Sequence, residues 1–302
     1  MPEGIICIDK PQGWTSFDVV AKCRGITKCR KIGHGGTLDP MATGVLPLFF
    51  GRAAKAVDLM PTQTKRYLAG MRLGTATDTQ DITGEVLSQS DAPVTREALE
   101  AALSTQRGTI RQLPPMYSAV WVDGKRLYDL ARQGREVERP LREVTVHRLE
   151  LIDYDEKERC CTFDVTCSKG TYIRTICHDV GGALGCGGVL TSLRRVETLG
   201  FTQEQCVTLE RLAEICREGT LEQHLLPVDR AFAGYGRVFL SPRQAKLFQS
   251  GVVLDAGRFR HPDTDAPLRI YEGGAAGRFL GLARIEPTTR ELVTIKLFAL
   301  AP

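Results

Sequence analysis

Apolar positions along the chain follow two periods, which together predict both strands and helices. Short apolar runs and alternating apolar positions predict strands at residues 4–9, 44–51, 65–73, 114–123, 143–153 and 160–168. Apolar residues three or four apart predict helices at residues 17–24, 52–60, 96–106, 125–133, 173–184 and 208–216. Ser16 is expected to cap the first of these helices, and a polar loop is expected at residues 74–84.

The order of these elements favours an α+β fold. Strands and helices alternate irregularly and several strands look like hairpins, which favours a mixed sheet flanked by helices over a doubly wound parallel sheet. The sequence changes character at residues 227–238, and the remainder is short and rich in glycine. We therefore expect a large domain at residues 1–232 and a small β-rich domain at residues 233–302, with strands at 279–285 and 292–300.

Composition narrows the functional classes without choosing one. The 302 residues are 42% hydrophobic and 25% charged, as in an ordinary globular protein. A net charge of +4 permits an anionic partner such as nucleic acid but does not require one. The N-terminal segment does not look like a signal peptide, and no run of about 18 apolar residues occurs. We expect a cytoplasmic protein with no membrane partner.

The ten cysteines do not indicate a metal site. No pair has the C-x-x-C spacing of a zinc ribbon or a thioredoxin-like motif. Several, such as Cys7 and Cys177, lie in apolar patterns. We expect reduced, buried cysteines that act as small apolar side chains, and no bound metal.

One glycine-rich segment, HGGTLDP at residues 34–40, holds a single carboxylate. Pro40 biases Asp39 toward an extended backbone, and Gly35 and Gly36 leave room for a ligand or another backbone. This arrangement suits a nucleophile or a general base, and it equally suits a plain turn. The segment lacks the Gly-Lys-Ser/Thr of a P-loop, and no spacing pairs Asp39 with a second carboxylate as in retaining glycosidases.

Several blocks of the sequence, in order and at similar spacing, resemble the bacterial TruB family, the tRNA pseudouridine-55 synthases. The blocks lie at residues 8–20, 33–48, 65–81, 116–140, 168–181 and 193–201. The resemblance covers roughly residues 4–230. It implies a pseudouridine-synthase fold with a largely antiparallel central sheet, and a small C-terminal RNA-binding domain of PUA-like type.

The resemblance also implies a reaction that uses no cofactor. The enzyme would break the N1–C1′ bond of the uridine at position 55 in the T-arm loop of tRNA. It would then turn the detached uracil and rejoin it through C5. Such an enzyme would act on tRNA without a metal and without a guide RNA, and the family suggests a monomer.

Particular residues match the family's site positions. Asp39 matches the catalytic aspartate, and the resemblance implies that it is the nucleophile. Arg174 matches an arginine that pairs with this carboxylate, and such a partner would keep Asp39 ionised. Tyr67 matches a tyrosine near the uracil that is a candidate for proton transfer.

Three further matches concern substrate binding. Tyr172 matches a residue that contacts the flipped base, Leu193 one that lines the uracil pocket, and His34 one that stacks in the RNA near the vacated base position. Stacking on aromatic side chains returns about 1–3 kcal/mol per base, against a flipping cost of a few kcal/mol. Without the motifs, each residue would be read more simply as a structural or core side chain.

The segment at residues 116–140 resembles the family's RNA-gripping insertion, which we place at about 105–145. Its arginines and aromatic residues suit RNA contact, although a solvated helix face explains the charges almost as well; they are Arg126, Arg132, Arg135, Arg139, Tyr117, Trp121 and Tyr128. The chain departs from the family at Gly35, usually threonine, and at Val189, often histidine or tyrosine. The first departure predicts a more mobile loop.

Two other functions fit the same residues. One is an RNA-guided pseudouridine synthase, against which the insertion at 116–140 argues. The other is a tRNA-binding or tRNA-folding protein with secondary catalysis, against which Asp39 and Arg174 argue.

Overall fold

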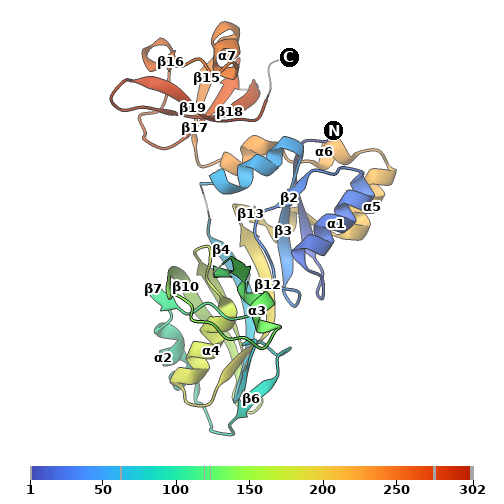
Figure 1. Ribbon diagram of the computed structural model, residues 1–302, viewed down its shortest axis with the longest axis vertical. Helices are drawn as coiled ribbons and strands as arrows, with labels where there is room; N and C mark the ends of the chain where they lie inside the picture. The colour runs from blue at the N-terminus through green and yellow to red at the C-terminus, as the bar shows by residue number, and fades with distance from the viewer. Residues whose placement is uncertain (1, 62, 119, 123, 275–276, 300–302) are drawn as a thin grey trace.

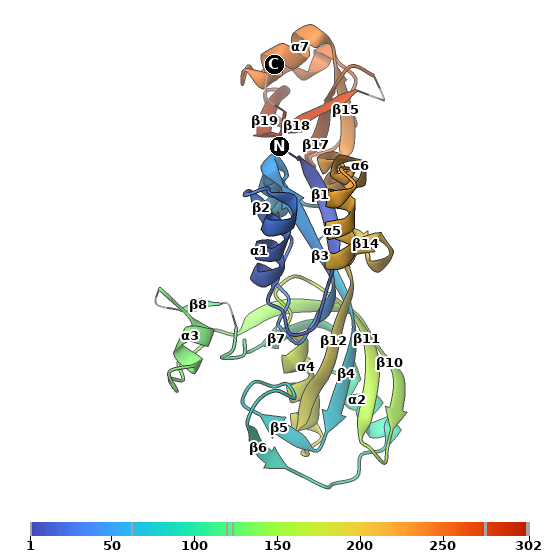
Figure 2. The same ribbon diagram turned by 90° about the vertical axis from the view of Figure 1, so that its right-hand side faces the viewer.

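The computed structural model describes residues 2–61, 63–118, 120–122, 124–274 and 277–299. Within them the chain is elongated, with a long twisted sheet in the lower part and a smaller sheet at the upper end (Figures 1 and 2). No helix among the described residues is both long and apolar enough to cross a membrane.

The large sheet has ten strands. Eight follow one another in the order β14 (Cys206–Val207), β1 (Gly4–Lys10), β3 (Thr43–Phe50), β12 (Gly188–Thr198), β4 (Lys65–Leu73), β11 (Cys160–Cys167), β10 (Arg142–Asp155) and β7 (Gly108–Gln112). The short strands β2 (Ile32–His34) and β13 (Phe201–Thr202) pair with β3 and β12. Among the described strands of this sheet, only β1 with β14 and β3 with β12 run parallel. The expectation of a mixed, largely antiparallel sheet is confirmed.

Strand β12 joins the two halves of this sheet. It pairs along most of its length with β4, and with β3 only where Arg194 and Arg195 meet Thr43 and Gly44. These two residues begin β3, directly after the segment that contains Asp39. The candidate loop therefore lies at the junction of the two halves.

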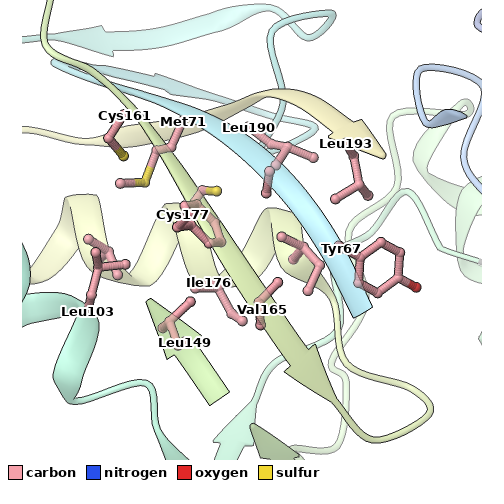
Figure 3. Packing of buried hydrophobic residues seen from close by; sticks show 14 of the residues in the cluster. Tyr67, Met71, Leu103, Leu149, Cys161, Val165, Ile176, Cys177, Leu190 and Leu193 are labelled. Atoms are coloured by element: carbon pink, nitrogen blue, oxygen red, sulfur yellow. The ribbon is translucent and has the colours of Figure 1, made fainter. Parts of the chain in front are cut away.

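Helices cover the two halves separately. Helices α1 (Ser16–Thr27) and α5 (Leu209–Arg217) form a core with β1 and β3. Helices α2 (Arg96–Ser104) and α4 (Ile173–Ala183) form a second core with β4, β10, β11 and β12 (Figure 3). The remaining helical segments before residue 233 are η1 (Gly51–Leu59), α3 (Leu127–Ala131), η2 (Gln203–Gln205), α6 (Leu221–His224) and η3 (Val228–Phe232).

The C-terminal part forms a five-stranded sheet in the order β15 (Gly236–Leu240), β17 (Leu268–Glu272), β18 (Arg278–Ile285), β19 (Glu291–Leu297) and β16 (Leu254–Asp255). Helix α7 (Pro242–Gln249) and the short η4 (Ala256–Arg258) accompany it. This sheet is the β-rich unit that the sequence predicts, although residue 300 of the second predicted strand lies outside the described residues. The division at 232/233 remains a prediction.

Two expectations for helix starts and types are wrong. Thr15, not Ser16, caps α1, because the Thr15 hydroxyl accepts a hydrogen bond from the backbone N–H of Asp18 and the Asp18 carboxylate accepts from Thr15 in return. Ser16 is buried and serves another purpose, described below. The helix expected at 52–60 is the 3₁₀ segment η1.

Other expectations fail where the chain turns sharply. The strand expected at 114–123 is reduced to β8 (Trp121–Val122), which pairs with β9 (Lys125–Arg126) at the start of the expected helix 125–133; residues 119 and 123 lie outside the described residues. The loop at 74–84 begins with β5 (Thr75–Thr77), paired with β6 (Val86–Gln89). Strand β12 was not expected at all.

The expectation of free, mostly buried cysteines is confirmed. All ten are free, and seven of them are buried. Cys160, Cys206 and Cys216 are partly exposed. Among the residues that the structure describes, no group of three or more His, Cys, Asp or Glu side chains is arranged to hold a metal.

Candidate active site

The loop between β2 and β3 is tethered on both sides of Asp39. The Ser16 hydroxyl accepts a hydrogen bond from the Leu38 N–H at 2.9 Å and donates to the Leu38 carbonyl at 3.3 Å. The Pro40 carbonyl accepts from the Gly13 N–H at 2.8 Å and from the Lys10 ammonium at 3.2 Å. Asp39 is therefore held between two neighbours that hydrogen bonds fix in place.

A buried arginine, Arg195 on β12, holds the same loop from below. Its guanidinium donates to the carbonyls of Gly36 at 3.1 Å, Thr37 at 3.4 Å and Val45 at 2.8 Å. The backbone approach is close, because a Cβ atom on Gly44 would lie 2.2 Å from the Arg195 carbonyl oxygen. The sequence did not single out Arg195, although alternation along β12 places it on the same face as Leu193.

The structure brings Asp39 and Arg174 together. The Arg174 Nε lies 3.0 Å from the Asp39 Oδ2, and the arginine side chain is 5% exposed while the aspartate is 40% exposed. The other guanidinium nitrogens donate to the carbonyls of Thr79 and Tyr117, both at 2.9 Å. One side chain thus ties the Asp39 loop, the 77–84 turn and the 116–140 insertion together, and leaves the carboxylate accessible.

A second carboxylate, Asp81, faces the same arginine. Its Oδ2 lies 3.8 Å from the Arg174 Nη1, and its Oδ1 accepts hydrogen bonds from the Thr79 hydroxyl and from the N–H and hydroxyl of Thr83. Asp81 is 6% exposed, so this network positions Arg174 from behind. The sequence placed Asp81 in a polar loop without a role, because its partner is more than 90 residues away in the chain.

Tyr67 and Leu193 form the apolar part of the site. They lie on the neighbouring strands β4 and β12 and join a buried cluster with Leu38 and Met41, which flank Asp39. Both lie at one end of this cluster, and the Tyr67 hydroxyl points away from its other labelled residues (Figure 3). Burial raises the pKa of Tyr67 to about 12 against the opposing effect of Arg195, so Tyr67 is a neutral phenol at physiological pH.

His34 and Tyr172 lie at the margin of these residues. His34 ends β2 and is half-buried, and its Nδ1 has no hydrogen-bond partner in the described part of the chain. Burial, and then the charge of Arg195, lower the pKa of His34, so its imidazole is neutral near pH 7. Tyr172 precedes α4, and its backbone N–H and carbonyl bind the Gln112 side chain at 3.0 and 3.2 Å.

The insertion reaches the site through the Tyr117 carbonyl. Beyond it, the Arg132 guanidinium lies 5.5 Å from the centroid of the Tyr128 ring, and Trp121 is 62% exposed. Arg139 donates to the Pro114 carbonyl at 3.1 Å. Arg132 and Trp121 are exposed on the insertion, and its role in gripping RNA remains a prediction.

Two protein-family models match consecutive parts of the chain. The family model described as "TruB family pseudouridylate synthase (N terminal domain)" matches residues 24–173. The model described as "tRNA pseudouridylate synthase B C-terminal domain" matches residues 174–233.

Curated proteins and a solved structure extend the similarity. A protein named tRNA pseudouridine synthase B from Azoarcus sp. (strain BH72) is 45% identical over 284 residues, which cover 93% of this chain and 90% of the relative. One of the same name from Clostridium perfringens (strain 13 / Type A) is 40% identical, covering 93% of this chain and 94% of the relative.

A chain in the "Crystal Structure of a Cbf5-Nop10-Gar1 Complex" matches with a TM-score of 0.76 at 24% identity, covering 99% of this chain and 86% of that one. This likeness shows the fold, and it confirms the expected pseudouridine-synthase architecture. Because the family models cover residues 24–233 and the two curated relatives match over nine-tenths of the chain, the protein belongs to the TruB family of pseudouridylate synthases.

Proposed function

We propose that the protein isomerises the uridine at position 55 of tRNA, in the T-arm loop, to pseudouridine, with Asp39 as the nucleophile. The observation that carries the proposal is the accessible Asp39 carboxylate, fixed on a tethered loop and contacted by a buried arginine at 3.0 Å. A carboxylate held in this way meets the need of nucleophilic catalysis for a positioned attacking atom. The names of the relatives point to tRNA as the substrate, and the family resemblance supplies position 55.

The chemistry requires one bond to break and another to form. Attack by Asp39 on C1′ of the ribose expels the uracil with the electron pair of the N1–C1′ bond. Attack on C6 of the base instead activates the same bond, and the loop serves either route. In both, C5 then bonds to C1′, the bond to Asp39 breaks and frees its carboxylate, the proton leaves C5, and N1 takes up a proton, so no net oxidation or cofactor is involved.

The surrounding side chains bind the base. Tyr67 and Leu193 offer an apolar wall next to Asp39, and Tyr172 precedes Arg174 by two residues. These contacts would offset the cost of extracting the base, which is a few kcal/mol. The neutral imidazole of His34 would stack in the RNA, since a neutral ring loses less hydration there than an imidazolium.

The proposal is for an enzyme that works on tRNA alone, as a cytoplasmic monomer without guide RNA. Its 116–140 insertion would grip the RNA, supported by the direct contact from Tyr117 to Arg174. The five-stranded sheet would form the PUA-like RNA-binding domain at residues 233–302. Size measurement by light scattering, with and without tRNA, tests the monomer.

The decisive experiment uses a bare, unmodified T-arm stem-loop. The wild type should convert one loop uridine, detected by chemical labelling of pseudouridine, without added metal or guide RNA. The isosteric variant Asp39→Asn should bind the RNA and convert none. Full conversion by Asp39→Asn, or tight binding by the wild type with no conversion, would refute the proposal.

A further inference from the structure

Positive side chains from two neighbouring strands converge beneath the glycine-rich loop. A Cβ atom on Gly36 would lie 3.6 Å from the Lys65 Nζ and 3.7 Å from the Arg195 Nη1. Lys65 begins β4, on the same face as Tyr67, and Arg195 comes from β12. Lys169, in the turn between β11 and α4, acts electrostatically on Lys65. Gly36 has no side chain, so nothing of its own covers these cations.

This group of cations has no matching carboxylate. None of the ion pairs among the described residues includes Lys65, Lys169 or Arg195, although Arg195 is fully buried. The acidic groups that act on Arg195 most strongly are the Tyr67 hydroxyl and two thiols. Burial, and then the positive charges of Arg195 and Lys169, lower the pKa of Lys65 to about 8. Buried charges in proteins are normally paired or hydrogen-bonded. Arg195 has its carbonyl acceptors, whereas Lys65 has no partner of either kind among the described residues.

Lys10 shows what a structural lysine looks like in the same protein. Its ammonium is buried and donates to the carbonyls of Pro11, Trp14 and Pro40. The half-buried Lys65 ammonium takes part in none of the hydrogen bonds among the described residues. A fold that needed Lys65 only for packing would have given it carbonyl acceptors or replaced it with an apolar residue.

We propose that Lys65, supported by Arg195, binds a backbone phosphate of the RNA next to the target uridine. This inference rests on the proposed function, since a uridine that reaches Asp39 brings its two flanking phosphates to the loop that holds Asp39. A phosphate oxygen above Gly36 would accept a hydrogen bond from the Lys65 ammonium. The positive charge of Arg195 would attract the same oxygen from below. Phosphate contacts of this kind fix the position of a nucleic acid without reading its sequence.

The test combines a charge deletion in the protein with a charge deletion in the RNA. Stem-loops carry a neutral methylphosphonate at the linkage 5′ or 3′ of the target uridine, and their dissociation constants are measured against the full chain. For the wild type, one of the two neutral linkages should weaken binding roughly tenfold. For Lys65→Met, the unmodified RNA should bind more weakly by a similar factor, and the same neutral linkage should have no further effect.

Two controls separate this contact from general charge loss. Lys65→Arg keeps the positive charge, so the neutral linkage should still weaken its RNA binding as it does for the wild type. Lys157→Met removes an exposed lysine from the turn between β10 and β11, at the opposite end of β11 from the residue that pairs with Lys65, and it should behave as the wild type. The slope of log affinity against log salt should fall by about 0.7 in Lys65→Met and stay unchanged in Lys157→Met.

The outcomes are distinct. Equal methylphosphonate penalties in the wild type and Lys65→Met would overturn the phosphate site, as would the absence of a penalty at both linkages in the wild type, a result that does not depend on any variant folding. Conversion of uridine by the wild type is scored separately. A methylphosphonate penalty that Lys65→Met abolishes, without conversion of uridine, would support the phosphate site and refute the activity. Conversion without such a penalty would support the activity and refute the phosphate site.

Discussion

Replacing Arg174 by lysine tests the centre of the site with the smallest chemical change. Arginine uses Nε for Asp39 and its two terminal nitrogens for the carbonyls of Thr79 and Tyr117. These acceptors lie in three directions that a planar fork can meet at once. A lysine ammonium is a single point of charge on a flexible chain, so Arg174→Lys keeps the charge and loses the geometry.

The loss can be estimated from the contacts. A hydrogen bond from a charged group contributes about 1.5–3 kcal/mol, and lysine can retain one of the three contacts. Two lost contacts amount to about 3–6 kcal/mol. Because water can reach Asp39, which is 40% exposed, we take the lower end. A loss of about 3 kcal/mol in the transition state slows the reaction on the order of 10²-fold.

Single-turnover conversion of the stem-loop, with enzyme in excess, measures this step directly. The rate should fall by about 10²-fold, whereas the dissociation constant for the RNA should change only a few-fold, because Arg174 is buried behind the carboxylate. Arg211→Lys is the matched control, since Arg211 is 44% exposed on α5 and pairs with Glu214 and Glu218. A wild-type rate in Arg174→Lys, or an effect confined to RNA affinity, would show that the reasoning is wrong.

Three further predictions concern the glycines and the unpaired lysine. Gly35→Thr restores the family's usual residue but should destabilise the protein by about 1–3 kcal/mol, because a Cβ there would lie 2.6 Å from the Leu199 side chain. In thermal or urea unfolding, this loss should be much smaller when Leu199 is replaced by alanine. Equal losses with leucine and with alanine at position 199 would contradict the explanation. Gly44→Ala should lower the free energy of unfolding by about 3 kcal/mol or more, because φ is +100° and the Cβ would lie 2.2 Å from the Arg195 carbonyl oxygen. A urea unfolding midpoint equal to that of the wild type would refute this prediction. Lys65→Met should raise the free energy of unfolding at pH 7 by up to about 3 kcal/mol, since the folded pKa of about 8 lies below the ordinary 10.5 and the folded state therefore disfavours the charged lysine. The gain over wild type should shrink as pH rises from about 8 to 10.5. Over that range the folded wild type has lost the lysine proton and the unfolded chain still holds it, so rising pH stabilises the wild type. A gain that does not change over that range would argue against a buried charge at Lys65.

The packing around Gly35 also changes the interpretation of this glycine, which stands where the family usually has threonine. The missing side chain suggested a looser loop. In the structure Leu199 and Phe49 occupy the volume where a Cβ would stand, and the Gly35 N–H donates to the Pro47 carbonyl at 2.8 Å. The substitution is compensated by packing from a residue far away in the chain, which the sequence around position 35 could not indicate.

Local patterns in the sequence determined several of the elements and identified Asp39 as a candidate site residue. Apolar runs located β1, β3 and β4, and helical spacing located α4, because side-chain periodicity is a property of neighbouring residues. The glycine-rich segment with Pro40 marked Asp39 as a held carboxylate, and the resemblance to a family added Arg174, which the structure places 3.0 Å away.

Only the tertiary structure decided what surrounds that carboxylate. Arg195 stands in an ordinary basic pair, Arg194–Arg195, and its burial depends on Val45, 150 residues earlier in the chain. The surroundings of Asp81 likewise depend on Arg174, and those of Lys65 on Gly36, and both of these neighbours lie on other elements. The free energy of a charged group depends on its desolvation and on the charges and dipoles within a few ångströms. Those neighbours come from the pairing of β12 with β3 and β4, a register set by the whole sheet.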